Sequence, residues 1–524
     1  MLGLLAIHAR TEAPQTNPIT DRMSQLTIVL MMLAGLVTML DWRKGLAMCV
    51  LVGIAQDPLR KLAPNQPVYY VVLVGAIFAF AWVRAAFVKV PLSPSAIHGW
   101  RRNLKTPFSI FVFLVLAQAM HSYTRYGSAL MTGIGLLVWL APIPAVMFGY
   151  QYAKRCGLAG VRRWMLLYII VAGVALSGVY FEYAGYGWPV LGEVGEGQIV
   201  YDLGGILKSH SGFFRSSETA AWHTATMSCF VFLLFIGKRA TIPKILTALC
   251  VIALLAGLGI LTGRRKMLIE IIVFLSVYFF FVAWLQRGMA RLAMVLLIMG
   301  AIGYIGILGF VDPDLVSRER SQSMSLDDDE PRLGSYAERG KSVFADLPAR
   351  VNALGVQPIR WAVYRHGWLG AGLGTGSQGG AGQVAEAYGV NRAAAEGGLG
   401  KVTMELGLPG LFMVVWLVTA LVKHLRQQIQ DTARLSPVHA RQSYGLVAFL
   451  VANAAAFSVA TQAFNDLFIL LILGWALGFL LAMPVLAASG DGVKRRRSQP
   501  HPAPGGVVGL PAIAALPIAS QARR

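Results

Sequence analysis

Apolar runs long enough to cross a membrane recur along most of this chain of 524 residues, separated by short polar connections. A helix rises about 1.5 Å per residue, so about 20 apolar residues cross a hydrocarbon core ~30 Å thick. The chain is 56% apolar with a mean hydropathy of +0.60, which is not typical of a soluble domain. The sequence therefore predicts an all-α fold, a polytopic transmembrane helical bundle. Thirteen candidate spans can be placed, or twelve without the short second one: 24–40, 45–56, 68–88, 107–121, 128–150, 164–181, 219–236, 243–262, 267–285, 291–311, 402–422, 443–463 and 465–486.

The basic residues indicate how these spans are oriented. A formal net charge of +21 could suit a nucleic-acid-binding protein, but most Lys and Arg lie in short connections between apolar runs. If the spans alternate, the richest clusters share one side, which the positive-inside rule assigns to the cytoplasm. We therefore expect a multi-pass membrane protein with a cytoplasmic C-terminus, membrane lipid as a partner and no nucleic acid. The clusters are "GWRRNLK" (99–105), "KRCGLAGVRR" (154–163), "QRGMAR" (286–291), "KHLRQQIQDTAR" (423–434) and "KRRR" (494–497).

The same pattern divides the chain into six regions. Its one long polar interruption is predicted to be a large outward loop that contains short helices. The cysteines lie in or beside apolar runs without metal-ligand or CxxC spacing, so neither a disulfide framework nor a metal site is expected. The regions are N-terminal transmembrane helices (1–181), an outward loop (182–218), further transmembrane helices (219–311), the large outward loop (312–400), C-terminal transmembrane helices (401–487) and a disordered cytoplasmic tail (488–524).

A short basic turn, "GRRK" at Gly263–Lys266, breaks the charge pattern. It places Arg264, Arg265 and Lys266 on the outward side, at the N-terminus of the next span, where the helix dipole favours anions. A helix N-terminus beside guanidinium groups suits a phosphate. The turn therefore predicts an anion site. The alternative is a miscounted span, which would make the turn an ordinary cytoplasmic anchor.

Further candidate residues lie in the two outward loops. Arg215 stands just before the span that follows loop 182–218, where a lipid headgroup would lie. Arg360 and Arg365 belong to an amphipathic segment that runs into glycines, and at five residues apart they lie about 140° apart on a helix, so they cannot grip one phosphate. His366 stands at the junction of this helix with the glycines, which we expect to let the backbone pass close to a ligand or another helix.

Two acidic residues near the end of the long loop are also candidates. Glu396 precedes the following span, and Glu405 lies about one turn inside it. An ionisable residue at membrane depth is a functional candidate, but a buried pair between Glu405 and Lys401, four residues earlier, is equally compatible. The acidic "DDDE" (327–330) lacks the ligand spacing of a calcium loop and indicates a flexible stretch.

Four segments in order resemble the O-antigen ligase and O-antigen polymerase superfamily, which are bacterial polytopic membrane glycosyltransferases. The resemblance covers about residues 211–417 and implies an inner-membrane protein that acts on a polyisoprenyl-diphosphate-linked oligosaccharide with its large loop in the periplasm. Ligases of this family commonly carry a His-Asn pair where this chain reads "EGGLGKV" (396–402), so the departure favours a polymerase. The segments are "SGFFRSSETAAW" (211–222), "LTGRRKMLIE" (261–270), "RWAVYRHGWLGAGLGTG" (360–376) and "MELGLPGLFMVVWL" (404–417).

The chemistry that this resemblance implies fits the candidate residues. A glycosyl diphosphate contains its own leaving group, so the enzyme must position it, neutralise the departing diphosphate and accept a proton, with no cofactor and no metal. A transporter or flippase for lipid-linked sugars is the main alternative, and other polysaccharide-assembly proteins are possible partners. The candidate diphosphate-binding residues are Arg264, Arg265, Lys266, Arg215, Arg365 and Arg360, and the candidate proton acceptors are His366, Glu405 and Glu396.

Overall fold

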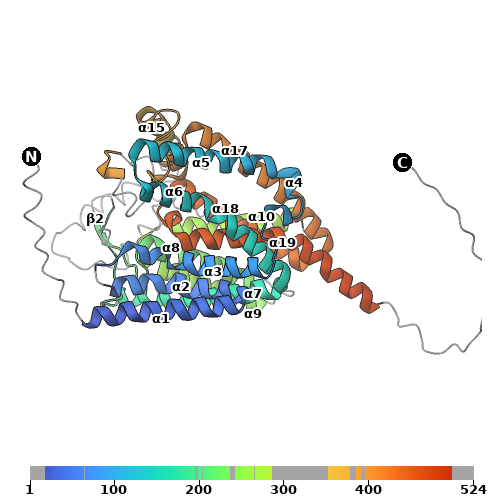
Figure 1. The fold of residues 1–524 in the computed structure, drawn as a ribbon. Coiled ribbons are helices and arrows are strands. Elements are labelled where there is room, and N and C mark those ends of the chain that lie inside the picture. Colours follow the sequence, from blue (N-terminus) through green and yellow to red (C-terminus); the bar gives the residue numbers. More distant parts are fainter. Residues whose placement is uncertain are drawn as a thin grey trace, which may run out of the picture.

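In the computed structural model, the described chain forms a bundle of long helices with one small β-hairpin (Figure 1). The structure describes residues 18–63, 65–194, 199–202, 205–235, 242–264, 266–285, 352–377, 385–390 and 396–498. Within them, six helices are long and apolar enough to cross a membrane, which confirms the predicted all-α polytopic bundle. Three shorter apolar helices accompany them, at Gln25–Leu40, Leu246–Leu261 and Ile269–Trp284.

The elements follow the predicted order of spans. The helices are α1 (Pro18–Leu40), α2 (Trp42–Leu62), α3 (Leu73–Phe87), α4 (Trp100–Asn103), α5 (Lys105–Tyr126), α6 (Ala129–Leu140), α7 (Pro142–Tyr183), α8 (Ser217–Phe235), α9 (Ile242–Leu261), α10 (Lys266–Leu285), α15 (Gln357–His366), α17 (Gly398–Leu435), α18 (Pro437–Val459) and α19 (Leu467–Ser498). Short helical turns are η1 (Val68–Val72), η2 (Pro94–Ala96), η3 (Asn352–Val356) and η5 (Ala463–Asn465). Strands β1 (Ile199–Asp202) and β2 (Gly205–Lys208) pair antiparallel in the loop between α7 and α8.

Several helices differ from the predicted spans in length or shape. The short second span is part of the 21-residue helix α2, whose first turn is capped by the Asp41 carboxylate accepting the Arg43 N–H at 3.0 Å. The predicted span 128–150 is split, because Pro142 starts a new helix after α6. Gly157, at φ 68°, then bends α7 where a connecting loop was expected.

The C-terminal helices also extend beyond their predicted ends. Helix α17 runs to Leu435 and is broken at Gly407, which adopts φ 71°. Helix α19 continues to Ser498, into the 488–524 segment predicted to be disordered. The predicted span 291–311 lies outside the described residues, as does most of the predicted loop 312–400.

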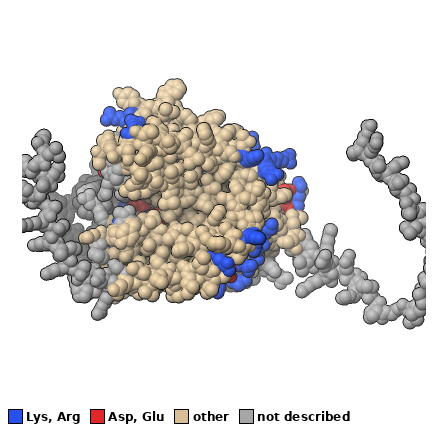
Figure 2. All heavy atoms as spheres, viewed as in Figure 1, with Lys and Arg blue, Asp and Glu red and all other residues tan. Residues whose placement is uncertain are grey.

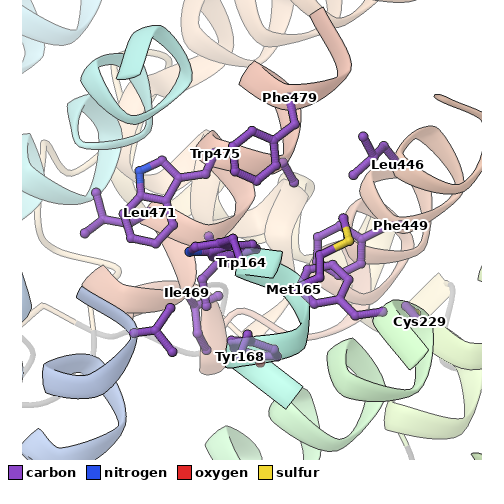
Figure 3. Packing of buried hydrophobic residues seen from close by; sticks show 14 of the residues in the cluster. Trp164, Met165, Tyr168, Cys229, Leu446, Phe449, Ile469, Leu471, Trp475 and Phe479 are labelled. Atoms are coloured by element: carbon purple, nitrogen blue, oxygen red, sulfur yellow. The ribbon is translucent and has the colours of Figure 1, made fainter. Parts of the chain in front are cut away.

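The core of the bundle is the contact between α7 and α19. Small residues let the two backbones approach closely: a Cβ on Gly478 would lie 2.3 Å from the carbonyl oxygen of Val146. Beside this contact, the indole of Trp164 packs edge-on against Trp475 and Phe479, with ring centroids 5.8 and 5.4 Å apart (Figure 3). This packing fixes the middle of α19 against α7.

The polar connections gather at the two ends of the bundle. At one end, which we call the basic end, Asn103 Nδ2 lies 3.2 Å from His424 Nδ1 and Gln428 Nε2 donates to the His98 carbonyl at 3.3 Å. Lys and Arg crowd this end, to the right in Figure 2, and the surface between the ends is almost free of charge. Two of the basic clusters that the alternation of spans places on one side, 99–105 and 423–434, therefore contact each other. At the other end, which we call the loop end, the residues before and at the start of α8 contact the turn after α9 and the connection between α18 and α19.

Candidate functional site

The connection between α18 and α19, residues 460–466, joins the segments of the loop end. The backbone N–H of Thr461 donates to the Glu396 carbonyl at 3.1 Å. Asn465 accepts a hydrogen bond from the buried ammonium of Lys401, at the start of α17. Asp466 forms an ion pair with Arg215 across 2.6 Å. The connection thus ties the end of the long loop and the start of α17 to the loop that precedes α8.

Arg215 lies in a buried ion cluster at the loop end. Its guanidinium contacts Asp466 at 2.6 Å and Asp57 of α2 at 3.9 Å, and its own backbone N–H donates to Asp57 Oδ2 at 3.1 Å. Both carboxylates are only 2% exposed. Lys61 extends the cluster by donating to the Gly212 carbonyl at 2.7 Å. Two buried carboxylates thus balance the charge of Arg215, and the cluster joins three separate parts of the chain.

Arg264 is the candidate cation that the structure places beside open space. It follows the turn after α9, where its Nη1 pairs with Glu218 Oε1 at 2.7 Å and its Nε donates to Ser217 Oγ at 2.8 Å. The side chain is 19% exposed. The contacts hold the guanidinium against the N-terminus of α8, in one orientation. Arg265 lies outside the described residues, and of Lys266 the structure describes only that it begins α10.

Glu193, in the loop before α8, completes this polar cluster. Its Oε1 accepts the Ser217 N–H at 3.3 Å and its Oε2 accepts a hydrogen bond from Ser209 at 3.1 Å. Burial and then the charge of Glu218 raise the pKa of the Glu193 carboxyl to about 7. Near neutral pH, Glu193 is therefore only partly ionised, and the net charge of the cluster that it forms with Arg264 and Glu218 changes with pH.

A pocket of about 370 Å³, counting the space that opens to solvent, lies between α8, α10, α18 and η5. Its deepest polar group is Glu270, which is 2% exposed. Asn453 Nδ2 donates to Glu270 Oε1 at 3.0 Å, and Trp222 Nε1 donates to Asn453 Oδ1 at 2.7 Å. The pocket thus has a cation at its rim and a carboxylate at its base. It is lined by Glu218, Ala221, Trp222, Arg264, Glu270, Ala456, Ala460, Gln462, Ala463 and Phe464.

The glycine-rich stretch after α15 folds against α5, α6 and α17. The Ala371 N–H donates to the Met404 carbonyl at 2.7 Å, and Ser122 of α5 donates to the Leu373 carbonyl at 2.8 Å. Gly374 adopts φ 85°, and a Cβ there would lie 2.1 Å from the Met131 carbonyl oxygen. The prediction that these glycines let the backbone pass close to another helix is confirmed.

Glu405 holds this glycine-rich stretch in place. Its carboxylate accepts the Trp139 indole N–H at 2.5 Å and the Gly376 backbone N–H at 2.9 Å, and the residue is fully buried. The alternative pairing with Lys401 is not formed as a direct contact among the described residues, because the Lys401 ammonium donates to Asn465 instead. Glu405 precedes the break at Gly407, so it lies in the short first segment of α17 and not in its long apolar part.

The candidates on α15 lie apart from the pocket. Arg360 and Arg365 are exposed, and the ring of His366 is half-buried and 5.6 Å from the Trp361 ring. None of these residues lines the pocket, and neither does Glu396, whose side chain is exposed. Of the predicted site residues that the structure describes, only Arg264 lines it.

Sequence analysis missed most of the residues that surround Arg264. Gln462 lies inside the predicted span 443–463, whereas in the structure α18 ends at Val459 and Gln462 belongs to the connection that follows it. Glu270 and Asn453 are isolated polar residues in apolar spans, and this was the available signal, because such residues face the bundle interior or a cavity. Glu193 carries no comparable signal in an irregular loop.

The chain matches no protein-family model, and a search of curated proteins finds no significant relative. The resemblance drawn from the four sequence segments therefore stays a prediction.

Proposed function

We propose that this protein is a metal-independent membrane glycosyltransferase that acts on a polyisoprenyl-diphosphate-linked oligosaccharide at the outer face of the cytoplasmic membrane, as a polymerase in preference to a ligase. The observation that carries the proposal is the position of Arg264. Its guanidinium is fixed by Glu218 and Ser217 at the rim of an open pocket, at the end of the bundle where the polar loops meet. A site there can take a headgroup while the lipid tail stays in the bilayer.

The four segments of the resemblance also meet in pairs. Segment 211–222 contacts 261–270 through the pair formed by Glu218 and Arg264. Segment 360–376 contacts 404–417 through Glu405 and the Gly376 N–H. Residues 460–466 contact the first pair through Asp466 and Arg215, and Asn465 contacts Lys401, three residues before the second pair, which supports one site built from separate parts of the chain.

In the proposed reaction, an acceptor hydroxyl oxygen attacks the anomeric carbon of the donor sugar. The bond from that carbon to the diphosphate oxygen breaks, and the electron pair leaves with the diphosphate. Arg264, with Arg265 and Lys266 next in the chain, would neutralise the growing charge. Arg215 is paired with two carboxylates, so we assign it a structural role at the loop end. Arg360 and Arg365 are exposed on α15, so we assign them to contacting the donor before it enters the pocket.

The proposed orientation puts the loop end outside and the basic end in the cytoplasm. A reporter enzyme that is active only after export should work when fused at Gly389, in the long loop, and stay inactive at Gln430 of α17. The reverse pattern would place Arg264 in the cytoplasm and remove the proposed site.

The activity is tested with purified protein in detergent and the lipid-linked oligosaccharide extracted from cells that lack this protein. Wild-type protein should convert this substrate into a ladder of longer products. Arg264→Ala should slow the conversion by roughly 10²-fold or more, and Arg264→Lys should restore it poorly because Lys lacks the planar fork. The matched control is Arg434→Ala, an exposed cation at the basic end. Absence of longer products with wild-type protein would refute the proposal.

The same preparation separates a transferase from a transporter or flippase. A transporter would leave the oligosaccharide length unchanged in detergent and would move the lipid-linked unit across the bilayer of proteoliposomes. A transferase needs no second compartment, so it should extend the product in either setting.

A further inference from the structure

We propose that Glu270 is the group that accepts the proton from the attacking hydroxyl, and that the pocket above it is the subsite for the acceptor sugar. This inference rests on the proposed transferase function and goes beyond it by assigning the acceptor side of the reaction. It replaces His366, Glu396 and Glu405 in that role, because none of those residues lines the pocket that Arg264 borders.

Glu270 combines burial with access to the pocket. The residue is 2% exposed and lies one turn into α10, yet it lines the pocket. Among the residues that the structure describes, its carboxylate accepts a hydrogen bond from Asn453, at Oε1 alone. The other carboxylate oxygen is therefore available to a ligand. A carboxylate inside a membrane bundle is costly to bury and is commonly kept for function.

Asn453 fixes the orientation of this carboxylate. Its amide oxygen accepts the Trp222 indole N–H at 2.7 Å, so its amide nitrogen must point towards Glu270, where it donates at 3.0 Å. In this series of hydrogen bonds, Trp222 donates to Asn453 and Asn453 in turn donates to Glu270. Asn453 is a positioning residue that keeps one carboxylate oxygen engaged and turns the other towards the pocket.

The walls of the pocket suit a sugar ring. Trp222 and Phe464 provide aromatic surface, small alanines leave space between them, and Gln462 and Glu218 provide hydrogen-bonding groups. Such a mixture of apolar surface with a few polar groups is typical of a small-ligand site. A sugar has apolar ring faces and polar edges, so it matches both kinds of wall.

The arrangement separates the two charges that the reaction develops. The acceptor hydroxyl gives its proton to the free carboxylate oxygen of Glu270 while its oxygen bonds to the anomeric carbon of the donor. The diphosphate leaves on the side of Arg264 at the rim. Glu270 ends protonated and returns the proton to water when the pocket empties. Neither step needs an additional reactant.

The test compares Glu270→Gln with wild-type protein, using the extracted lipid-linked oligosaccharide. Gln keeps the oxygen that Asn453 binds and the volume of the side chain but cannot accept the proton, so the transfer rate should fall by ~10²–10⁴-fold. Thermal stability and binding of the extracted lipid-linked oligosaccharide should stay close to wild type, because Arg264 is unchanged. Asp431→Asn, an exposed acid at the basic end, is the control and should keep the wild-type rate.

A second variant covers the case in which Glu270→Gln does not fold. Ala460→Leu leaves Glu270 in place but fills the pocket, so it should lower the transfer rate at least tenfold while preserving binding of the lipid-linked donor. If wild-type protein transfers and either folded variant keeps the wild-type rate, the inference is overturned and the proposed function stands. If wild-type protein does not transfer, both are overturned.

Discussion

Replacing Glu405 by Gln tests whether this residue is structural or catalytic. The carboxylate accepts two N–H donors, from the Trp139 indole at 2.5 Å and from the Gly376 backbone at 2.9 Å, in a fully buried position. A Gln side chain has one oxygen, so one of the two donors would face an amide NH₂ group. We therefore expect Glu405→Gln to loosen the glycine-rich stretch from α6 and α17.

The magnitude follows from the lost contact. A hydrogen bond to a charged group contributes about 1.5–3 kcal/mol, and a buried donor left without a partner costs ~1–3 kcal/mol. The free energy of unfolding should therefore fall by about 2–3 kcal/mol in Glu405→Gln. Glu396→Gln should change it by less than ~0.5 kcal/mol, because the Glu396 side chain is exposed.

The assay is thermal unfolding of the purified variants in detergent, together with limited trypsin digestion. Exposed Arg360 and Arg365 lie next to the glycine-rich stretch, so cleavage there should accelerate in Glu405→Gln when the stretch detaches. Wild-type stability and an unchanged cleavage rate, combined with loss of transfer activity, would refute the structural role and return Glu405 to the candidate proton acceptors.

Three other predictions follow from single contacts. Arg215→Ala leaves two buried carboxylates without their cation, so it should lower the free energy of unfolding by about 3–5 kcal/mol, and an unchanged unfolding midpoint would contradict the ion cluster. Gly478→Ala should lower the unfolding midpoint because its Cβ meets the Val146 carbonyl at 2.3 Å, whereas Gly133→Ala, in α6 with open space around it, should not. The pKa of Glu193 is about 7 in the folded protein against an ordinary 4.5, so its protonated form contributes stability that is complete below pH 4.5 and is lost as pH rises through 7. Glu193→Gln should therefore flatten this part of a profile of stability against pH.

The sequence by itself determined the class of fold and the approximate positions of the spans. The length of each apolar run predicts a span, because a helix that crosses a bilayer needs about 20 apolar residues whatever it packs against. It also indicated Arg264, just before the start of α10, through a break in the charge pattern. Helix ends were less accurate: α2 and α17 extend well past their apolar runs because their polar ends pack on other connections.

Only the tertiary structure decided which polar residues share a site. Arg264 and Glu270 lie six residues apart in one segment, but their partners Glu218 and Asn453 come from two other segments, and no spacing in the chain relates them. The structure also separated Arg215, balanced by Asp57 and Asp466, from a cation that can meet a ligand. The physical reason is that hydrophobicity acts on each span independently, whereas burial, hydrogen bonding and charge pairing depend on which spans pack together.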